Sequence, residues 1–396
     1  MNTKRQTKWF LIPYAAMALT MGSALVSFAA TGWAEENGEW VYYNNDGSKA
    51  TDVFKKSGNN WFYLDSDGIM AKNQLIEDDD NYFYVNSAGA MVTNQWRSIE
   101  NEDSGSDEPD EWWYYFQSNG KAVKKSGSSD NVKFVTLPTS TGQAKFTFDD
   151  EGHMLYGWID ESGEMLTDDD AWKSGMYYCS DNGDGRMATG WKYIPAVNDE
   201  DDDREGDGYW FYFSTNGKKT VDNDSKKING QYYGFDVNGK MLQGLYRIEF
   251  EANGKTIRSA EEIEDVDEIP DEDEDGVFVY YFGDSPKEGA MKTGTMTMEI
   301  DGDKYYYSFE KSGSKKGAGT DGIDGDSIYV KGRRLEAEEG TKYQPVTYKD
   351  ETYLISTSGK LVKNKKNVKD SDDVYYKTDS KGRIVDSGGK AGLITV

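Results

Sequence analysis

An aromatic residue followed by glycine recurs along the chain and limits the folds it can adopt. Trp40, Trp61 and Tyr82 lie 21 residues apart, and each is followed seven residues later by a Gly. We call the aromatic residue position zero. The same frame, in places with another residue at position zero, recurs at Trp113, Lys145, Trp210, Tyr232, Tyr306, Thr352 and Tyr375, in stretched form at Tyr177 and Tyr280, and in degraded form near Tyr329. Such a period indicates a repeat protein in which each unit is one supersecondary element.

Each repeat has the pattern of a β-hairpin. Runs such as Trp40-Val41-Tyr42-Tyr43 cluster strand-favouring types with rings on both faces. The Asp/Asn/Ser-x-Gly element that follows supplies a residue that adopts positive φ, so the chain reverses there, and another strand begins near Gly-Trp, as at Gly32-Trp33. An isolated hairpin is marginal in water, so its ring faces must be buried on its neighbours. We predict an all-β fold, an elongated solenoid of stacked β-hairpin repeats.

Composition excludes several classes of function. The 72 acidic and 45 basic side chains give a net charge of -27, which repels polyanions, so we expect no nucleic-acid binding. His153 and Cys179 are the single residues of their types, so neither a disulfide framework nor a zinc site can form. Close carboxylate pairs are inevitable among so many acids and carry no information about glycoside hydrolysis. No phosphate-binding Gly loop or nucleophile elbow is present. We expect no catalysis and no cofactor.

The first residues have the pattern of an export signal. Lys4, Arg5 and Lys8 precede an apolar stretch from Trp9 to Val26, and small residues at Ser27 and Ala29 mark a cleavage site. This predicts a signal peptide over residues 1–29, with an uncleaved membrane anchor as the alternative. No second long apolar run follows, so we expect a secreted, extracellular protein that is associated with the cell wall and leaves the membrane after cleavage.

The rest of the chain divides by sequence pattern. Residues 30–317 hold the hairpin repeats with acidic insertions, and residues 318–396 hold degenerate repeats that lack Trp. The insertions span 100–111, 198–208 and 261–276. Residues 271–276 match the first half of a calcium loop, but Phe282 stands where a bidentate Glu is needed, and residues 201–206 fail in the same way at Tyr212. Weak calcium binding by these loops stays an open alternative to simple solvation.

The order Gly-Trp, short loop, Trp-x-Tyr-Tyr and x-Asp-Gly is best preserved at Gly32-Trp33 with Trp40 to Gly47, and at Gly190-Trp191 with Trp210 to Gly217. On these motifs the chain resembles the cell-wall-binding, or choline-binding, repeat family of Gram-positive surface proteins, to which glucan-binding repeats are related. The resemblance covers nearly all of residues 31–396. It implies a hairpin solenoid that attaches noncovalently to wall teichoic acid or polysaccharide.

The resemblance also implies ligand-binding residues. In choline-binding members a cage is formed by the Gly-Trp indole, the indole of the aromatic strand and an aromatic residue of the next hairpin, and a quaternary ammonium is held there by cation–π attraction. Carried onto this sequence, the cages are Trp33 and Trp40 with Trp61 or Tyr63, Trp191 and Trp210 with Tyr232, and Trp158 with Tyr177. The alternative is that these rings only form the core between hairpins.

These observations predict a secreted, noncatalytic protein that attaches to choline-bearing teichoic acid or polysaccharide through aromatic hairpin repeats. The competing hypothesis is a structural or adhesive surface protein whose acidic loops bind a protein partner or calcium.

Overall fold

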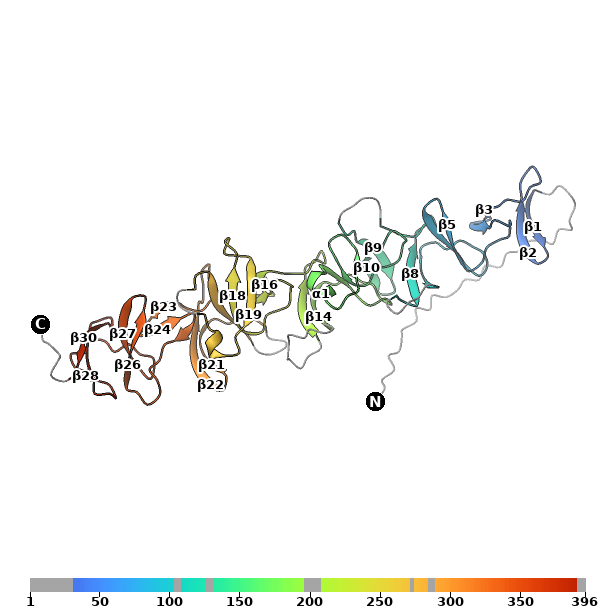
Figure 1. Cartoon of the computed structure of the whole chain (residues 1–396). Helices are drawn as coiled ribbons and strands as arrows, with labels where there is room; N and C mark the ends of the chain where they lie inside the picture. The colour runs from blue at the N-terminus through green and yellow to red at the C-terminus, as the bar shows by residue number, and fades with distance from the viewer. Residues whose placement is uncertain are drawn as a thin grey trace. The chain divides into compact units, whose positions relative to one another are not determined.

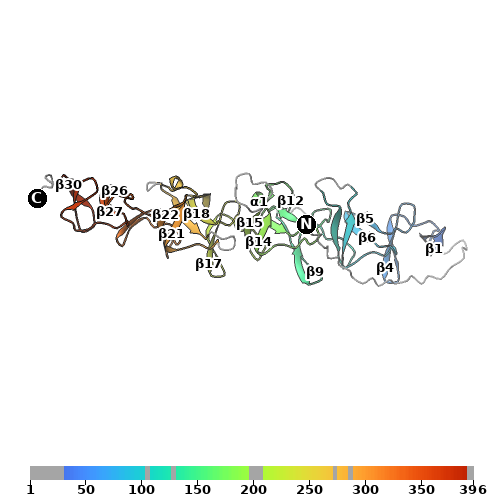
Figure 2. The same cartoon turned by 90° about the horizontal axis from the view of Figure 1, so that it is seen from below.

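The computed structural model describes residues 31–102, 108–125, 131–195, 208–270, 274–283 and 289–389. Two compact units are present: residues 1–190 with 215–218 form the first, and residues 191–214 with 219–396 form the second. In each unit, β-hairpins follow one another along the chain, as two perpendicular views show (Figures 1 and 2). The predicted all-β hairpin solenoid is therefore confirmed within each unit. The predicted change of sequence pattern at residue 317 falls inside the second unit.

The first unit contains five two-stranded hairpins and a three-stranded sheet among its described residues. The hairpins are β1 (Gly32–Glu36) with β2 (Glu39–Tyr43), β3 (Val53–Ser57) with β4 (Asn60–Leu64), β5 (Gln74–Asp78) with β6 (Asn81–Val85), β7 (Gln95–Glu100) with β8 (Glu111–Phe116), and β9 (Val135–Thr139) with β10 (Gly142–Phe146). The sheet orders β12 (Met165–Leu166), β11 (Gly157–Ile159) and β13 (Tyr177–Cys179), and the short helix α1 (Ala171–Ser174) precedes β13.

The second unit departs more from a plain two-stranded repeat. It begins with β14 (Gly190–Pro195) and β15 (Gly208–Phe213), then β16 (Asn223–Ile228) and β17 (Gln231–Phe235), followed by a sheet of β19 (Ile257–Glu262), β18 (Gly244–Phe250) and β20 (Val277–Phe282) with the 3-10 helix η1 (Val266–Glu268). A five-stranded sheet orders β21 (Gly294–Ile300), β22 (Asp303–Phe309), β25 (Arg333–Arg334), β24 (Ser327–Val330) and β23 (Gly322–Asp324). The last sheets are β26 (Tyr343–Tyr348) with β27 (Glu351–Ser356), and β28 (Val368–Lys369), β29 (Tyr375–Thr378) and β30 (Ile384–Gly388).

Each aromatic strand buries its two faces against different neighbours. Gly32 pairs with Tyr43, so Trp33 lies opposite Tyr42. Strand residues alternate between faces, so positions zero and +2 point toward the following hairpin and positions +1 and +3 toward the preceding one. Phe62 and Leu64, at +1 and +3 of β4, are 1% and 0% exposed and pack against the rings of the first hairpin. The core thus consists of a series of buried interfaces between successive hairpins.

A backbone hydrogen bond joins successive hairpins at the same place in the repeat. The residue at position +9 donates its N–H to the carbonyl of position zero in the preceding hairpin. Met70 donates to Trp40 at 2.8 Å, and Met241 donates to Trp210 at 2.9 Å. This bond sets the spacing of the stack and brings the +9 side chain, usually Met, beside the position-zero ring.

The turn residue that recurs in each repeat is Gly for a packing reason as well as for its positive φ. Gly120 has a φ of +84°, and a Cβ built there would lie 2.5 Å from Met91 Sδ, where Met91 is the +9 residue of the preceding hairpin. Gly89 meets Met70 in the same way, at 2.8 Å from its Cε. In these hairpins the turn therefore lies against the Met of the hairpin before it.

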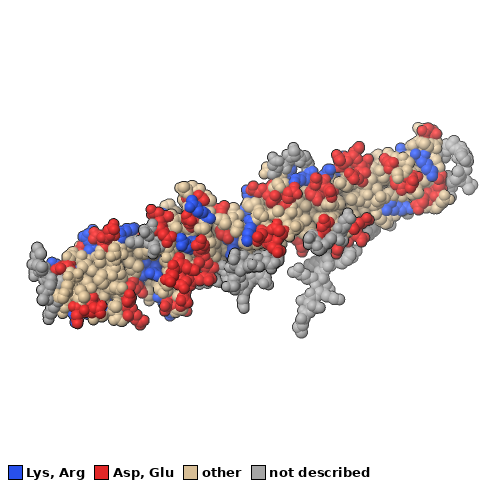
Figure 3. Space-filling model, viewed as in Figure 1, with Lys and Arg blue, Asp and Glu red and all other residues tan. Residues whose placement is uncertain are grey.

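The predicted insertions differ in kind. The insertion at 100–111 begins at the last residue of β7 and ends at the first residue of β8, whereas 261–276 begin in the added strand β19 and include η1, so this insertion is not a plain loop. Residues 201–206 and the first half of the calcium-like segment, 271–273, lie outside the described residues, as does the predicted signal peptide 1–29. Acidic side chains are spread over the visible surface of both units (Figure 3). Within the described ranges, no helix is both long and apolar enough to cross a membrane.

Candidate functional site

Trp33 and Trp40 meet on the face of the first hairpin that covers its neighbour. Both indoles are half-buried and pack against Phe62, Leu64 and Met70. The Trp33 ring makes edge contacts with Tyr42 and with Phe62, each at a centroid distance of 5.4 Å. The two indoles therefore share one wall, which the next hairpin supplies. We call this group the first ring cluster.

The third ring of the first cluster differs from the predicted one. Trp61 and Tyr63 were the predicted contributors, but both lie on the opposite face of β4 from Phe62. Trp61 is 41% exposed, and Tyr63 packs instead against Phe54 at 5.0 Å. A shift of one residue along a strand reverses the face. Phe62 at position +1 closes the cluster.

Trp191 and Trp210 form the corresponding group in the second unit. Their ring centroids are 6.3 Å apart at an interplanar angle of 83°, and Trp191 lies 4.8 Å from the Tyr233 ring. Met241 and Phe235 complete the buried wall. Tyr232, the predicted third ring, is again on the wrong face, and Tyr233 takes its place for the same reason. This is the second ring cluster.

A fourth aromatic side chain extends the second ring cluster. Tyr193 lies opposite position zero on the neighbouring strand, with its ring 5.6 Å from that of Trp210, and it is 47% exposed. At the equivalent place in the first hairpin the residue is Glu35, which pairs with Trp40. The two clusters therefore share the indole pair and differ at this neighbour and in the side chains that the next hairpin supplies.

Sequence reasoning missed a third ring cluster, which contains Trp96 and Trp113. Both pack against Phe146, Phe148 and Met154 of the next hairpin, and the Trp96 ring lies 4.7 Å from that of Phe146. Trp96 follows Gln rather than Gly, and the insertion at 100–111 separates the two indoles by 17 residues instead of the seven between Trp33 and Trp40. The signal that identifies this pair is the turn glycine Gly120. Trp113 lies seven residues before it, and the strand pairing then places Trp96 opposite Tyr115.

Trp158 and Tyr177 do not form a shared group. Trp158 pairs with Tyr178 across the sheet and contacts its ring at 5.1 Å, whereas Tyr177 lies opposite Ile159 and packs on Phe134 at 5.3 Å. Neighbouring strand residues face opposite sides, so the predicted pair is divided between two layers. Trp158 is only 7% exposed and belongs to the core.

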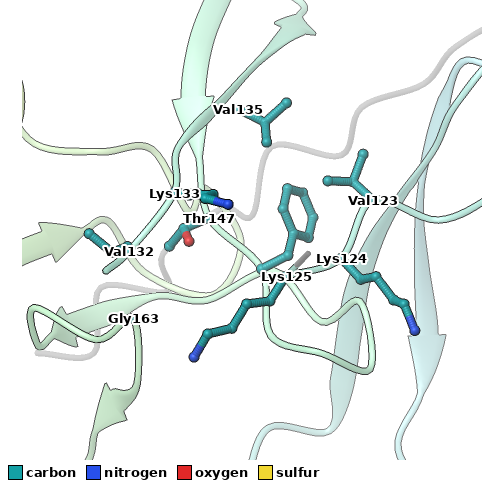
Figure 4. A pocket seen from close by; sticks show the side chains of 9 residues that line it. Val123, Lys124, Lys125, Val132, Lys133, Val135, Thr147 and Gly163 are labelled. Atoms are coloured by element: carbon teal, nitrogen blue, oxygen red, sulfur yellow. The ribbon is translucent and has the colours of Figure 1, made fainter. Parts of the chain in front are cut away.

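The clearest pocket of the described surface lies elsewhere and has the wrong chemistry for a quaternary ammonium. It is lined by Val123, Lys124, Lys125, Val132, Lys133, Val135, Thr147, Phe148 and Gly163 (Figure 4). Three lysines oppose a cation, and Phe148 is its single ring. The ammonium of Lys125 is paired with Glu164 at 2.7 Å, and Lys124 lies over Tyr82, so neither is free for an anion. We therefore place the candidate site at the ring clusters.

The remaining reactive side chains serve packing. The His153 ring stacks on Trp112 at 4.3 Å, and its Nδ1 lies 2.8 Å from Asp149 Oδ2. Cys179 is fully buried, and burial raises the pKa of its thiol to about 12, so it is no nucleophile in the folded protein. Among the described residues, no group of three His, Cys, Asp or Glu side chains is arranged to hold a metal ion.

Comparison with known families fits the position of the first ring cluster. The profile of the choline-binding repeat matches residues 30–67 and 54–96. Residues 30–96 are therefore choline-binding repeats. A profile for a cell wall binding repeat also matches residues 113–122, which begin at the position-zero indole of the third ring cluster. The resemblance predicted from the Gly-Trp and aromatic-strand motifs is confirmed for these choline-binding repeats. No curated protein matches the sequence.

Several solved structures from Streptococcus pneumoniae are similar to this chain. Choline binding protein F is 20% identical, over 84% of this chain and 98% of its own, with a TM-score of 0.42. The modular autolysin LytC is 19% identical, over 83% of this chain and 52% of its own, with a TM-score of 0.41. The choline binding domain of Spr1274 is 33% identical, over 24% of this chain and 95% of its own, with a TM-score of 0.18. The chain thus spans about half the length of LytC.

Proposed function

We propose that this chain is an exported, noncatalytic protein that attaches to choline-bearing cell-wall polymer through its three ring clusters. The observation that carries the proposal is the repeated indole pair. Trp33 with Trp40, Trp96 with Trp113, and Trp191 with Trp210 each lie half-buried against a ring and a Met of the next hairpin. The rings are thereby held in place before any ligand arrives.

Cation–π attraction gives these clusters their chemistry. A ring contributes roughly 0.5 to 2 kcal/mol toward a cation on its face, depending on how far the site excludes water. If each of three rings contributes about 1 to 1.5 kcal/mol of binding free energy, their sum corresponds to a dissociation constant of ~1 mM for one cluster. The net charge of -27 favours the approach of a cation over that of an anion. Several weak clusters on one chain gain from binding to the same polymer.

Retention on choline-bearing walls tests this proposal. Wild-type protein should bind such walls, or a resin with choline head groups, and free choline at several times the single-site dissociation constant should release it. A variant with Trp33→Ala, Trp96→Ala and Trp191→Ala should pass through. As a matched control, a variant with Tyr82→Ala and Tyr306→Ala removes two rings outside the clusters and should be retained like the wild type.

Choline-insensitive retention, or equal retention of the triple variant, would refute the role of the clusters and favour the acidic-loop hypothesis. Clearing of walls in a zymogram by the purified protein would refute the noncatalytic part. Export predicts that protein recovered from the culture medium or the cell surface begins near residue 30, which mass spectrometry of the N-terminal peptide measures.

A further inference from the structure

The chain's own cations divide the position-zero rings into two groups. In four hairpins without a Trp on the first strand, a basic side chain lies over the position-zero ring: Lys124 over Tyr82 at 5.9 Å, Lys56 over Trp61 at 6.0 Å, Lys316 over Tyr232 at 4.2 Å, and Arg334 over Tyr306 at 3.9 Å. Over the part of the chain that the structure describes, no Lys or Arg lies over any of the six indoles of the three ring clusters. Lys55 lies 5.0 Å from Tyr42, two residues beyond Trp40.

The clearest example of a covered position-zero ring is found where the β16–β17 hairpin packs against β20. Asp224 follows Asn223, which pairs with Phe235 as Gly32 pairs with Tyr43, so it stands where the preceding hairpin has Trp191, although the register shifts between Asn223 and Lys226. The Asp224 carboxylate accepts a hydrogen bond from Tyr280 Oη at 3.3 Å. Gly244 pairs with Phe282, which places Tyr280 at position +1, the position that closes the ring clusters, and not at position zero as predicted from the sequence. This interface therefore keeps the rings at position zero, Tyr232, and at position +1, Tyr280, but has the Asp224 carboxylate in place of the first-strand indole.

Lys316 reaches Tyr232 from the hairpin after next. Met291 donates its N–H to the Tyr232 carbonyl at 2.8 Å, and its side chain lies against Gly317. This contact brings the neighbouring Lys316 over the Tyr232 ring. The Lys316 ammonium forms no ion pair among the described residues, although the chain is strongly acidic, and it lies instead over the Tyr232 ring. Lys227 approaches the same ring at 5.7 Å.

We propose that these basic side chains act as internal ligands that occupy the position-zero rings of the hairpins lacking a first-strand Trp, and so restrict quaternary ammonium binding to the three ring clusters. Lys316 is the specificity-determining residue at Tyr232. An ammonium on a ring face and a trimethylammonium on the same face exclude each other through size and like charge. This inference rests on the proposed function for its ligand but concerns different residues.

Choline-binding capacity, measured by equilibrium dialysis at saturation, tests it. Because Lys227 also approaches the Tyr232 ring, the variants are made in a Lys227→Met background. The wild type and Lys227→Met alone should bind three choline molecules per chain, and Lys316→Met in that background should bind four. Lys316→Gln, which removes the charge and keeps a polar end, should bind four as well. Lys311→Met is the matched control, because it removes the same charge from the same loop with no ring contact, and it should bind three. Adding Tyr232→Leu to Lys316→Met should return the capacity to three.

The outcomes separate the two proposals. A wild type that binds choline at three clusters, with Lys316→Met and Lys316→Gln unchanged at three, would overturn the internal-ligand inference and leave the proposed function standing. A wild type that binds none, with one site gained in both Lys316 variants and lost with Tyr232→Leu, would support the inference and refute the proposed function. Circular dichroism of each variant confirms that the hairpins remain folded, and Lys316→Gln covers the case in which Met at 316 disturbs folding.

Discussion

The contact between Gly120 and Met91 of the preceding hairpin predicts a measurable difference between two glycines of equal conformation. Gly47 and Gly120 both have a φ of +84°. A Cβ on Gly47 would meet nothing within 4 Å, whereas a Cβ on Gly120 would lie 2.5 Å from Met91 Sδ and 2.6 Å from its Cε. Ala at either position meets the steric cost of the left-handed region, about 1 to 2 kcal/mol. Only at Gly120 does it also displace a packed side chain.

The expected magnitudes follow from these two costs. Gly47→Ala should lower the free energy of unfolding by about 1 to 2 kcal/mol. Gly120→Ala should lower it by a further ~1 kcal/mol, the lower end of the cost of overpacking, because the atoms displaced are the flexible end of the half-buried Met91. Urea denaturation followed by tryptophan fluorescence measures both. The double variant Gly120→Ala with Met91→Ala should show a favourable coupling, because the smaller side chain removes the clash.

Equal losses at the two glycines would refute the reasoning, since the backbone cost would then account for everything. So would the absence of coupling in the double variant. Either result would mean that the turn of one hairpin does not rest on the Met of the one before it.

Three further predictions concern other buried groups. Burial lowers the pKa of Lys219 from 10.5 to about 8, so between these pH values the folded state binds fewer protons than the unfolded state and the free energy of unfolding rises with pH. Lys219→Met should abolish that rise. At pH 7 it should also raise the free energy of unfolding by up to about 3 kcal/mol, less the cost to Asp236 of losing its neighbouring cation, as urea denaturation at pH 7 and 10 measures. Trp158→Ala should cost about 3 to 5 kcal/mol by denaturation without changing choline capacity, whereas Trp33→Ala should remove one bound choline. The Cys179 thiol should resist a disulfide reagent at pH 8 in the folded protein and react after unfolding, as an absorbance assay shows.

Repeat length and strand pattern were sufficient to predict the fold class. The aromatic run and the Gly at +7 recur closely enough to fix hairpins, because both depend on local sequence. The same counting does not identify every turn glycine that packs on a Met. In the Tyr306 copy Gly313 keeps the spacing, yet Gly317 is the glycine that lies against Met291. Strand β19 and helix α1 are insertions that no repeat period announces.

The candidate site was predictable only in part. Trp33 with Trp40 and Trp191 with Trp210 follow from motifs within one hairpin. The ring that completes each pair comes from the next hairpin, and its identity depends on which face of that strand points backward. Phe62 and Tyr233 occupy that face, one residue from the predicted positions. Such a one-residue difference is set by packing between hairpins, which the sequence of a single repeat does not specify.

A crystal structure grown with choline tests the central claim most directly. It should show a trimethylammonium group against the indoles of Trp33 and Trp40, of Trp96 and Trp113, and of Trp191 and Trp210, with none over Tyr82 or Tyr306. Choline absent from all three indole pairs at a saturating concentration, or bound at the lysine- and arginine-covered rings instead, would contradict the account.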